Sequence, residues 1–192
     1  LVFIYFFLYL RSELITTLYV SMKKKPAAFL DRDGVINYDY GYVFKYEDFK
    51  LRPGVIKGLR YLKKNNYRIF LITNQSGIAR GFFTEKDLRL LHSKFQRYLL
   101  KKKIKLDEIK YSPYHPKGKI KKFTKSHASR KPDNLMIKQI LKKWSIDKKK
   151  SFMIGDNLSD KKCAKKSTLY FQYAKKNFYL QVRSILKSKK FR

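Results

Sequence analysis

The sequence predicts an α/β fold, in which a mostly parallel sheet carries helices on both faces. Short apolar runs bounded by turn residues alternate along the chain with segments whose apolar residues recur at helical spacing. Several of the short runs end in a polar side chain, as at Asp31, Thr73 and Asp156. The carboxyl ends of parallel strands meet at one edge of a sheet, so we expect these side chains to surround one crevice.

Strands are predicted where a short apolar run stops at turn residues. The last of them is less apolar than the others, and we expect it at the edge of the sheet. In chain order the predicted strands cover residues 27–30, 67–72, 108–111, 151–154 and 168–173.

Helices are predicted from apolar periodicity and from residues that begin or end helices. Pro53 and Pro132 each open a helix, because proline suits the first helical turn. Thr84 and Asp87 form a capping pair at the start of the longest amphipathic helix. A short helix ends at Lys166, a closing helix covers 179–186, and the segment 112–129 is predicted to be a loop.

Length and charge restrict the possible classes of protein. A chain of 192 residues can bury the core of one α/β domain but is short for two. The formal net charge is +33, spread over lysine pairs and triplets such as 101–103 and 148–150. Such a surface attracts phosphates, nucleic acids and anionic lipids. The lysines show no groove-like pattern with interleaved aromatic residues, so we interpret the charge as a compositional bias at solvent-exposed positions.

Residues 1–21 differ from the rest of the chain. The first ten residues are apolar, which is too few for a transmembrane helix of about 20 residues, and no signal-peptide pattern is present. We interpret 1–21 as an apolar extension, Met22 as the natural start and 22–192 as the folded domain. A membrane-surface anchor is the alternative for 1–21. A single cysteine, Cys163, excludes a disulfide framework and fits the cytoplasm.

Two carboxylates, Asp31 and Asp33, follow the first predicted strand, and Gly34 lets the backbone turn sharply after them. Side chains alternate along a strand, so both carboxylates can leave its end toward the same side. Crowded carboxylates need a cation between them, which indicates a hard divalent ion such as Mg²⁺. Asp156 would complete this metal site together with the backbone carbonyl of Asp33, and Asp160 could orient these groups.

The same side chains suit phosphoryl transfer. A carboxylate with a reference pKa of about 3.9 is ionised at neutral pH, so Asp31 can attack phosphorus without a base and form an aspartyl-phosphate. Asp33 can protonate the leaving oxygen and later deprotonate the attacking water. Thr73 and the backbone amides of 74–75 can donate to phosphate oxygens, and Lys131 supplies a fixed positive charge.

Five stretches carry a family resemblance: F-L-D-R-D-G-V-I-N (29–37), D-Y-G-Y-V (39–43), T-N-Q-S-G-I-A-R-G (73–81), R-K-P-D-N-L-M (130–136) and F-M-I-G-D (152–156). The stretches other than 39–43 resemble the four signature motifs of the haloacid dehalogenase (HAD) phosphohydrolase superfamily. Within it the chain looks like the D-glycero-D-manno-heptose-1,7-bisphosphate 7-phosphatase family, and the phosphatase half of bifunctional histidinol-phosphate enzymes is closely similar. The resemblance spans about 27–164 and implies a Rossmann-like HAD fold with no large cap domain.

The resemblance also implies roles for individual residues. Asp31 would be the nucleophile, Asp33 the acid and base, and Thr73 and Lys131 the groups that stabilise the phosphoryl group. The metal ligands would be Asp31, Asp33 and Asp156. The substrate would contact Asp31, Arg32, Asp33, Asp39, Tyr40, Gly41, Tyr42, Thr73, Asn74, Gln75, Ser76, Arg130 and Lys131.

The chain departs from the family pattern in two places. Asn157 stands where the family often has Lys or Arg. Many members also carry a zinc loop with four Cys or His ligands, and the matching positions here are Ser112, Tyr114, His127 and Ser129. Serine and tyrosine are poor zinc ligands, so we expect no structural zinc, even with His115 nearby.

We therefore expect a cytoplasmic, Mg²⁺-dependent phosphomonoester hydrolase that removes the 7-phosphate of D-glycero-D-manno-heptose 1,7-bisphosphate. Histidinol-phosphate phosphatase and nucleic-acid 3′-phosphatase are alternatives; the second suits the charge, but 39–43 and 130–132 fit the heptose family better. A basic nucleic-acid- or membrane-binding protein on a HAD scaffold is the non-enzymatic alternative, and the intact motifs argue against it. We expect a monomer whose partner is a small phosphorylated metabolite, with no specific nucleic acid and no stable membrane insertion.

Overall fold

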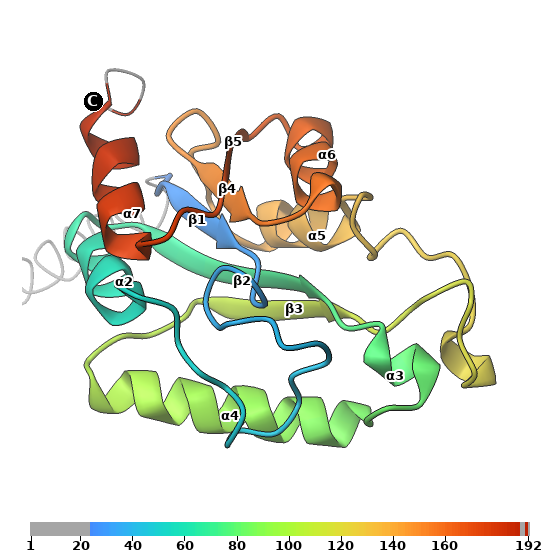
Figure 1. Ribbon diagram of the computed structural model, residues 1–192. Coiled ribbons are helices and arrows are strands. Elements are labelled where there is room, and N and C mark those ends of the chain that lie inside the picture. Colours follow the sequence, from blue (N-terminus) through green and yellow to red (C-terminus); the bar gives the residue numbers. More distant parts are fainter. Residues whose placement is uncertain (1–23, 189–190, 192) are drawn as a thin grey trace, which may run out of the picture.

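The computed structural model describes residues 24–188 and residue 191. Within that part of the chain, five parallel strands form one sheet in the order β3-β2-β1-β4-β5 (Figure 1). The strands are β1 (Ala27–Leu30), β2 (Arg68–Asn74), β3 (Glu108–Ser112), β4 (Phe152–Gly155) and β5 (Tyr170–Tyr173). The five predicted strands and the edge position of the last one are confirmed, with ends displaced by up to two residues.

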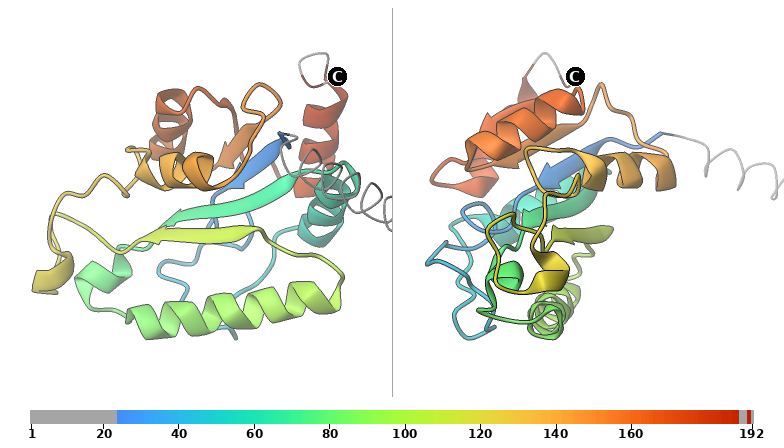
Figure 2. Two further views of the ribbon diagram at one scale, coloured as in Figure 1. Left: turned by 180° about the vertical axis from the view of Figure 1, so that it is seen from behind. Right: turned by 90° about the vertical axis from the view of Figure 1, so that its right-hand side faces the viewer.

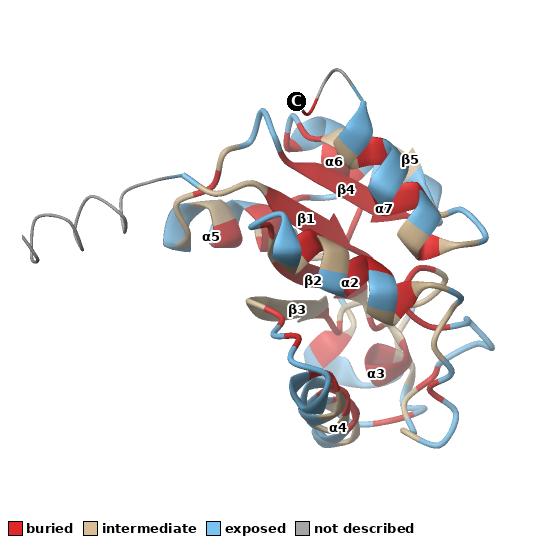
Figure 3. Ribbon diagram, turned by 90° about the vertical axis from the view of Figure 1, so that its left-hand side faces the viewer, coloured by how far each residue is buried: buried red, intermediate tan, exposed pale blue. Residues whose placement is uncertain are grey.

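Helices cover both faces of the sheet, as predicted. One hydrophobic cluster packs α2 (Val55–Lys64), α4 (Glu85–Lys101) and α7 (Phe178–Lys187) against one face. A second cluster packs α5 (Leu135–Lys143) and α6 (Leu158–Lys166) against the other. The long α4 lies beside β3 in the views of Figure 2, and Figure 3 shows the buried strands in red between the helices.

The central strand, β1, contributes side chains to the hydrophobic clusters on both faces of the sheet. Ala28 and Leu30 of β1 join the first cluster, and Ala27 and Phe29 join the second. All four are fully buried, as expected for a parallel strand covered on both faces. Because β1 lies between β2 and β4, the residue that follows it, Asp31, emerges at the centre of the carboxyl edge.

The longest helix is fixed at its start by the predicted capping pair. Thr84 Oγ1 accepts a hydrogen bond from the Asp87 backbone N–H, and Asp87 Oδ2 accepts one from the Thr84 N–H. This capping box satisfies two donors that the first helical turn leaves without an intrahelical partner. Phe95 and Leu99 then bury the apolar face of α4 in the first cluster.

The helix predicted to open at Pro132 begins three residues later, at Leu135. The backbone of Lys131 is already occupied, because its N–H donates to Asn74 Oδ1 and its carbonyl accepts from Asn74 Nδ2, each at 3.0 Å. Residues 130–133 therefore form a turn fastened to β2 rather than a first helical turn. Two short elements were not predicted: α3 (Gly77–Arg80) and the 3-10 helix η1 (Lys121–Phe123) within the predicted loop.

The predicted apolar extension, residues 1–21, lies outside the described residues. Among the described helices, none is both long enough and apolar enough to cross a membrane. The division of the chain into 1–21 and 22–192 stays a proposal.

We propose that residues 22–192 fold without residues 1–21, because the described residues by themselves form a five-stranded sheet with a hydrophobic cluster on each face. A chain beginning at Met22 is expected to be soluble and to have the same thermal unfolding midpoint as the full chain. Differential scanning calorimetry of both chains tests this. Insolubility or a clearly lower midpoint of the shorter chain would mean that the segment packs on the domain.

Candidate active site

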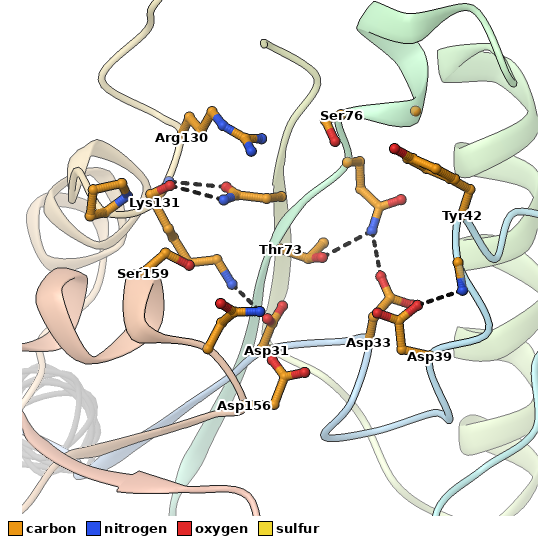
Figure 4. Close-up of a pocket in the computed structure, with 16 residues that line it drawn as sticks. Asp31, Asp33, Asp39, Tyr42, Thr73, Ser76, Arg130, Lys131, Asp156 and Ser159 are labelled. Carbon is orange, nitrogen blue, oxygen red and sulfur yellow. Dashed lines mark hydrogen bonds and ion pairs between the residues drawn. The ribbon is translucent and has the colours of Figure 1, made fainter.

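A pocket of about 650 Å³ opens at the carboxyl edge of the sheet, at the ends of β1, β2 and β4 (Figure 4). Asp31 and Asp156 lie at its floor, and Arg130 and Tyr42 lie on opposite sides of its mouth in this view. The lining residues are Asp31, Asp33, Asp39, Gly41, Tyr42, Thr73, Asn74, Gln75, Ser76, Gly77, Arg130, Lys131, Pro132, Asp156, Asn157 and Ser159.

The ammonium of Lys131 holds the centre of the pocket together. Its Nζ lies 2.8 Å from Asp31 Oδ2 and 2.5 Å from Asp160 Oδ1, and it donates to the Ile72 carbonyl at 3.0 Å. The ammonium thus forms two ion pairs and one hydrogen bond, and the Lys131 side chain is only 2% exposed. The other oxygen of Asp31, Oδ1, accepts a 2.7 Å hydrogen bond from the Arg32 backbone N–H. The Asp31 carboxylate is therefore fixed from both sides.

The charges at this point are not balanced by the protein alone. Burial raises the pKa of Asp31 from its ordinary value of 3.8 to about 7, although the Lys131 ammonium acts in the opposite direction. Burial by itself would lower the pKa of Lys131, but Asp31 and Asp160 raise it above its ordinary value. Burial and the nearby Asp160 also raise the pKa of Asp156. The site holds more carboxylates than one ammonium neutralises, and it favours a further cation.

Three carboxylates are placed where they could hold such a cation. One oxygen each from Asp31, Asp156 and Asp160 lies within 4.8 Å of the others, and Asp156 is the exposed member. Gly34 permits this closeness, since a Cβ at its position would lie 2.1 Å from Asp156 Oδ2, and its φ of +73° also favours glycine. Carboxylate oxygens are the ligands that Mg²⁺ prefers, so the donor set fits this ion.

Asp33 is held by donors on every side. Its Oδ1 accepts from Arg32 Nε at 3.1 Å, from Arg32 Nη2 at 2.8 Å and from Asn37 Nδ2 at 2.9 Å. Its Oδ2 accepts from Arg32 Nη2 at 2.8 Å and from Gln75 Nε2 at 2.9 Å. The same Gln75 amide donates to Thr73 Oγ1 at 3.0 Å, so Gln75 joins the ends of β1 and β2. Thr73 Oγ1 accepts that bond, and its own O–H can donate into the pocket.

The mouth of the pocket is basic on one side. Arg130 lines the pocket and donates to the Tyr114 carbonyl at 3.2 Å. Burial and the neighbouring Arg80 guanidinium lower the pKa of Arg130. Arg80 Nη2 lies 3.3 Å from His115 Nε2. Adjacent like charges are unfavourable without an anion between them, so this side of the mouth suits an anionic ligand.

Two residues of the predicted substrate-contact set do not line the pocket. Tyr40 is 65% exposed and stacks on Tyr38 instead. Arg32 is fully buried, and its guanidinium points to Asp33, to the Val43 carbonyl and to His92. Burial, and then the Arg32 charge, lower the pKa of His92 to about 3. The physical reason is that Arg32 follows Asp31 directly, and the alternation at the strand end turns its side chain into the protein.

The pocket also contains residues that sequence reasoning did not place there, namely Gly77, Pro132, Asn157 and Ser159. Gly77 is the first residue of α3, where a Cβ would lie 2.2 Å from Phe83. Asn157 and Ser159 lie at the start of α6, directly after Asp156. Two features of the sequence could have indicated these positions: the polar stretch T-N-Q-S-G at 73–77 and the helix that begins after Asp156.

The four positions that match the zinc ligands of the family are joined here by hydrogen bonds and by a ring stack. Ser129 Oγ donates to Ser112 Oγ at 3.0 Å and lies 2.8 Å from His127 Nδ1. The ring of Tyr114 stacks on the ring of His127 with centroids 4.0 Å apart. These hydrogen bonds and this stack connect the end of β3 to the segment that carries Arg130.

Comparison with known proteins gives relatives over most of the described domain. A family model described as polynucleotide kinase 3 phosphatase matches residues 27–184. The chain is 41% identical over 145 residues to a D-glycero-beta-D-manno-heptose-1,7-bisphosphate 7-phosphatase of Rhodopseudomonas palustris, covering 76% of this chain and 81% of that protein. It is 45% identical over 139 residues to the enzyme of the same description from Photorhabdus laumondii, covering 72% of this chain and 74% of the relative.

Solved structures agree with the fold. The D,D-heptose 1,7-bisphosphate phosphatase of B. bronchiseptica, complexed with magnesium and phosphate, is 27% identical with a TM-score of 0.70, covering 83% of this chain and 86% of that one. A HAD-like phosphatase of Mesorhizobium loti is 24% identical with a TM-score of 0.75, covering 86% of this chain and 90% of that one, and shows the shared fold.

The raised pKa of Asp31 predicts how the metal-free protein responds to pH. Between pH 3.8 and about 7 the folded protein keeps a proton that the unfolded chain has lost, so the free energy of unfolding falls as pH rises. At about 1.4 kcal/mol for each pH unit, the loss amounts to a few kcal/mol. In the presence of a chelator, Asp31→Asn is expected to gain stability relative to the parent as pH rises from 5 to 8.

Urea unfolding at several pH values measures this difference, and Asp39→Asn, at the pocket rim, is the matched control. Added Mg²⁺ is expected to stabilise the parent more than Asp31→Asn. If the stability of the parent and of Asp31→Asn depended on pH in the same way, the raised pKa assigned to Asp31 would be wrong.

We expect this protein to bind no structural zinc. A closed zinc site needs about four nitrogen, sulfur or carboxylate ligands at about 2.0–2.3 Å. Of the four loop positions only His127 carries such a group, and its Nδ1 already lies 2.8 Å from Ser129 Oγ. Elemental analysis of protein purified without added metal measures the zinc content. One zinc per chain, with thermal stability lost to a chelator and regained with Zn²⁺, would show the expectation to be wrong.

Proposed function

The chain belongs to the D-glycero-D-manno-heptose-1,7-bisphosphate 7-phosphatase family of HAD phosphatases and is a phosphatase, and from this we propose that it removes the 7-phosphate of that sugar bisphosphate with Mg²⁺. One observation carries the proposal. Asp31 stands at the end of the central strand, fixed by Lys131 at 2.8 Å, inside a pocket that has carboxylates at its floor and an arginine at its mouth.

In the proposed first step, a carboxylate oxygen of Asp31 attacks phosphorus. The bond from phosphorus to the sugar oxygen breaks, and Asp33 gives its proton to that oxygen. In the second step water attacks the phosphorus of the aspartyl-phosphate, and Asp33 takes the water's proton. Inorganic phosphate leaves, and Asp31 returns to a carboxylate.

The remaining groups stabilise charge on the phosphoryl oxygens. The Lys131 ammonium is 2.8 Å from Asp31 Oδ2 and therefore lies beside the reacting atoms. The Thr73 hydroxyl and the backbone amide of Asn74 would supply neutral donors at the end of β2. The Gln75 backbone N–H, expected from the sequence to join them, instead donates to the Ser112 carbonyl at 2.7 Å and is not available to a phosphate. The available groups are already in position before the reaction begins, so they stabilise the transition state without having to reorganise. Such preorganised stabilisation supplies most of the rate acceleration in phosphoryl transfer.

Mg²⁺ fits the carboxylate floor described above. Asp31, Asp156 and the backbone carbonyl of Asp33 would hold it, and it would reduce the repulsion between the carboxylates and the phosphate. The relative from B. bronchiseptica has been solved with magnesium and phosphate, which supports this assignment. Asp160 would orient the site through its 2.5 Å ion pair with Lys131.

A substrate with two phosphates suits the two charged regions of the pocket. The first phosphate would meet Asp31 and Lys131, and the second would meet Arg130 at the mouth, with Arg80 adding to the positive potential there. The loop of Asp39, Gly41 and Tyr42 closes the opposite side and would contact the sugar. This arrangement favours a bisphosphate over histidinol phosphate, which has a single phosphate.

A nucleic-acid 3′-phosphatase is the second candidate. The description of the matching family model and the net charge of +33 both favour it. The curated relatives at 41% and 45% identity favour the heptose substrate. Because those relatives are phosphatases, a non-enzymatic basic protein is not retained as an alternative. We also propose a cytoplasmic location. The proposed substrate is a small sugar phosphate, and the one cysteine of the chain, Cys163, is free and buried, as suits a reducing compartment.

The substrate assignment predicts a rank order of specificity constants. With Mg²⁺ present, kcat/KM is expected to be highest for heptose 1,7-bisphosphate, lower for histidinol phosphate and lowest for a 3′-phosphorylated oligonucleotide. Binding of DNA is expected to weaken steeply with salt, because only phosphate contacts support it. A phosphate-release assay over these substrates measures the order. Preferential hydrolysis of the oligonucleotide would overturn the assignment.

Arg130 is predicted to recognise the second phosphate. Arg130→Gln is expected to raise KM for the bisphosphate by on the order of 10-fold or more, since a charged hydrogen bond is lost. The KM for the same sugar carrying only the 7-phosphate should change much less. Arg60→Gln, an exposed arginine on α2, is the matched control. An equal effect of Arg130→Gln on both sugars would argue against this contact.

A further inference from the structure

Arg32 is one of the largest fully buried side chains in the described part of the chain. A buried guanidinium stays charged and must be paired with acceptors. Its Nη2 donates to both oxygens of Asp33 at 2.8 Å and to the Val43 carbonyl at 2.6 Å, and its Nε donates to Asp33 Oδ1 at 3.1 Å. Arg32 is thus organised around Asp33 rather than around the pocket.

His92 completes this pairing from α4. Its Nε2 lies 3.4 Å from Arg32 Nη1, and its side chain is buried. A guanidinium can only donate, so His92 Nε2 must be the acceptor, which requires a neutral ring. Arg32 consequently joins three parts of the molecule: the loop after β1, the loop that ends at Val43, and α4.

These contacts leave the two oxygens of Asp33 in different positions. Oδ1 receives two nitrogens of Arg32 and the Asn37 amide, at 2.8–3.1 Å. Oδ2 receives one nitrogen of Arg32 and Gln75 Nε2. Gln75 itself lines the pocket, whereas Arg32 does not. The oxygen on the pocket side of the carboxylate is therefore Oδ2, and it has fewer donors.

We infer that Arg32 and His92 are positioning residues that orient Asp33 so that its Oδ2 exchanges the proton with the leaving oxygen. Arg32 fixes the carboxylate with its fork of N–H groups, and His92 fixes the guanidinium by accepting from its third nitrogen. The inference rests on the proposed role of Asp33 as acid and base. Neither side chain touches the substrate.

The leaving group of the substrate provides the test. An alkyl phosphate such as the sugar phosphate needs a proton on its leaving oxygen, whereas p-nitrophenyl phosphate leaves as a weakly basic anion and does not. The ratio kcat/KM reports only the steps up to phosphoryl transfer, so later water attack does not enter. Loss of proton transfer should therefore lower kcat/KM for the alkyl substrate selectively.

Asp33→Asn sets the reference, with an expected selective loss on the order of 100-fold or more for the alkyl substrate. Arg32→Lys keeps a charge but lacks the fork, and should show the same selectivity on the order of 10-fold. His92→Leu should show it as well, and His92→Gln, which keeps an acceptor, should restore most of the activity. Arg97→Met, on the exposed face of α4, is the control that should change neither substrate.

The outcomes separate the two levels of the argument. Without a selective loss in Asp33→Asn, the proposed role of Asp33 fails. With that loss present, equal effects of His92→Leu on both substrates, or none on either, overturn the inference and assign His92 to the core alone. Because the His92 pair gives its own answer, the test stands even where Arg32→Lys does not fold.

Discussion

The ion pair between Lys131 and two carboxylates is the interaction on which this site depends. Lys131 comes from the turn before α5, Asp31 follows the end of β1, and Asp160 lies on α6. One oxygen of each carboxylate lies within 2.8 Å of the Lys131 ammonium. The ammonium also donates to Ile72 in β2, so one buried cation connects four elements at the edge of the sheet. Removing one partner of such a pair would leave an uncompensated buried charge, which is strongly destabilising.

The same pairing leaves a chemical demand that the protein does not meet by itself. Two carboxylates share Lys131, Asp156 stands beside them, and burial disfavours the charged form of Asp31. A bound cation would hold Asp31 ionised and ready to attack, and would lower the repulsion toward phosphate. The excess of buried negative charge at the pocket floor therefore accounts both for the affinity of the site for a cation and for the part that this cation would play in the proposed reaction.

The strand ends could be predicted from the sequence because parallel strands bring their carboxyl ends together. Asp31, Thr73 and Asp156 accordingly line one pocket, as do Arg130 and Lys131. The start of α5 could not be predicted, since Asn74 binds the backbone of Lys131 across 57 residues of chain. The direction of the Arg32 side chain could not be predicted either. The motif gives the position of Arg32 in the chain but not the acceptors that Val43 and His92 provide. Local patterns thus placed the backbone, and long-range hydrogen bonds decided individual side chains.

The proposed reaction passes through a covalent aspartyl-phosphate on Asp31, which can be trapped chemically. Acid quenching during turnover, followed by borohydride reduction and mass spectrometry of the peptides, identifies a phosphorylated carboxylate by its conversion to homoserine. We expect homoserine at position 31 in the parent protein, none at Asp33 or Asp156, and none at all in Asp31→Asn. Reduction at another carboxylate, or full turnover by Asp31→Asn, would contradict the proposed reaction.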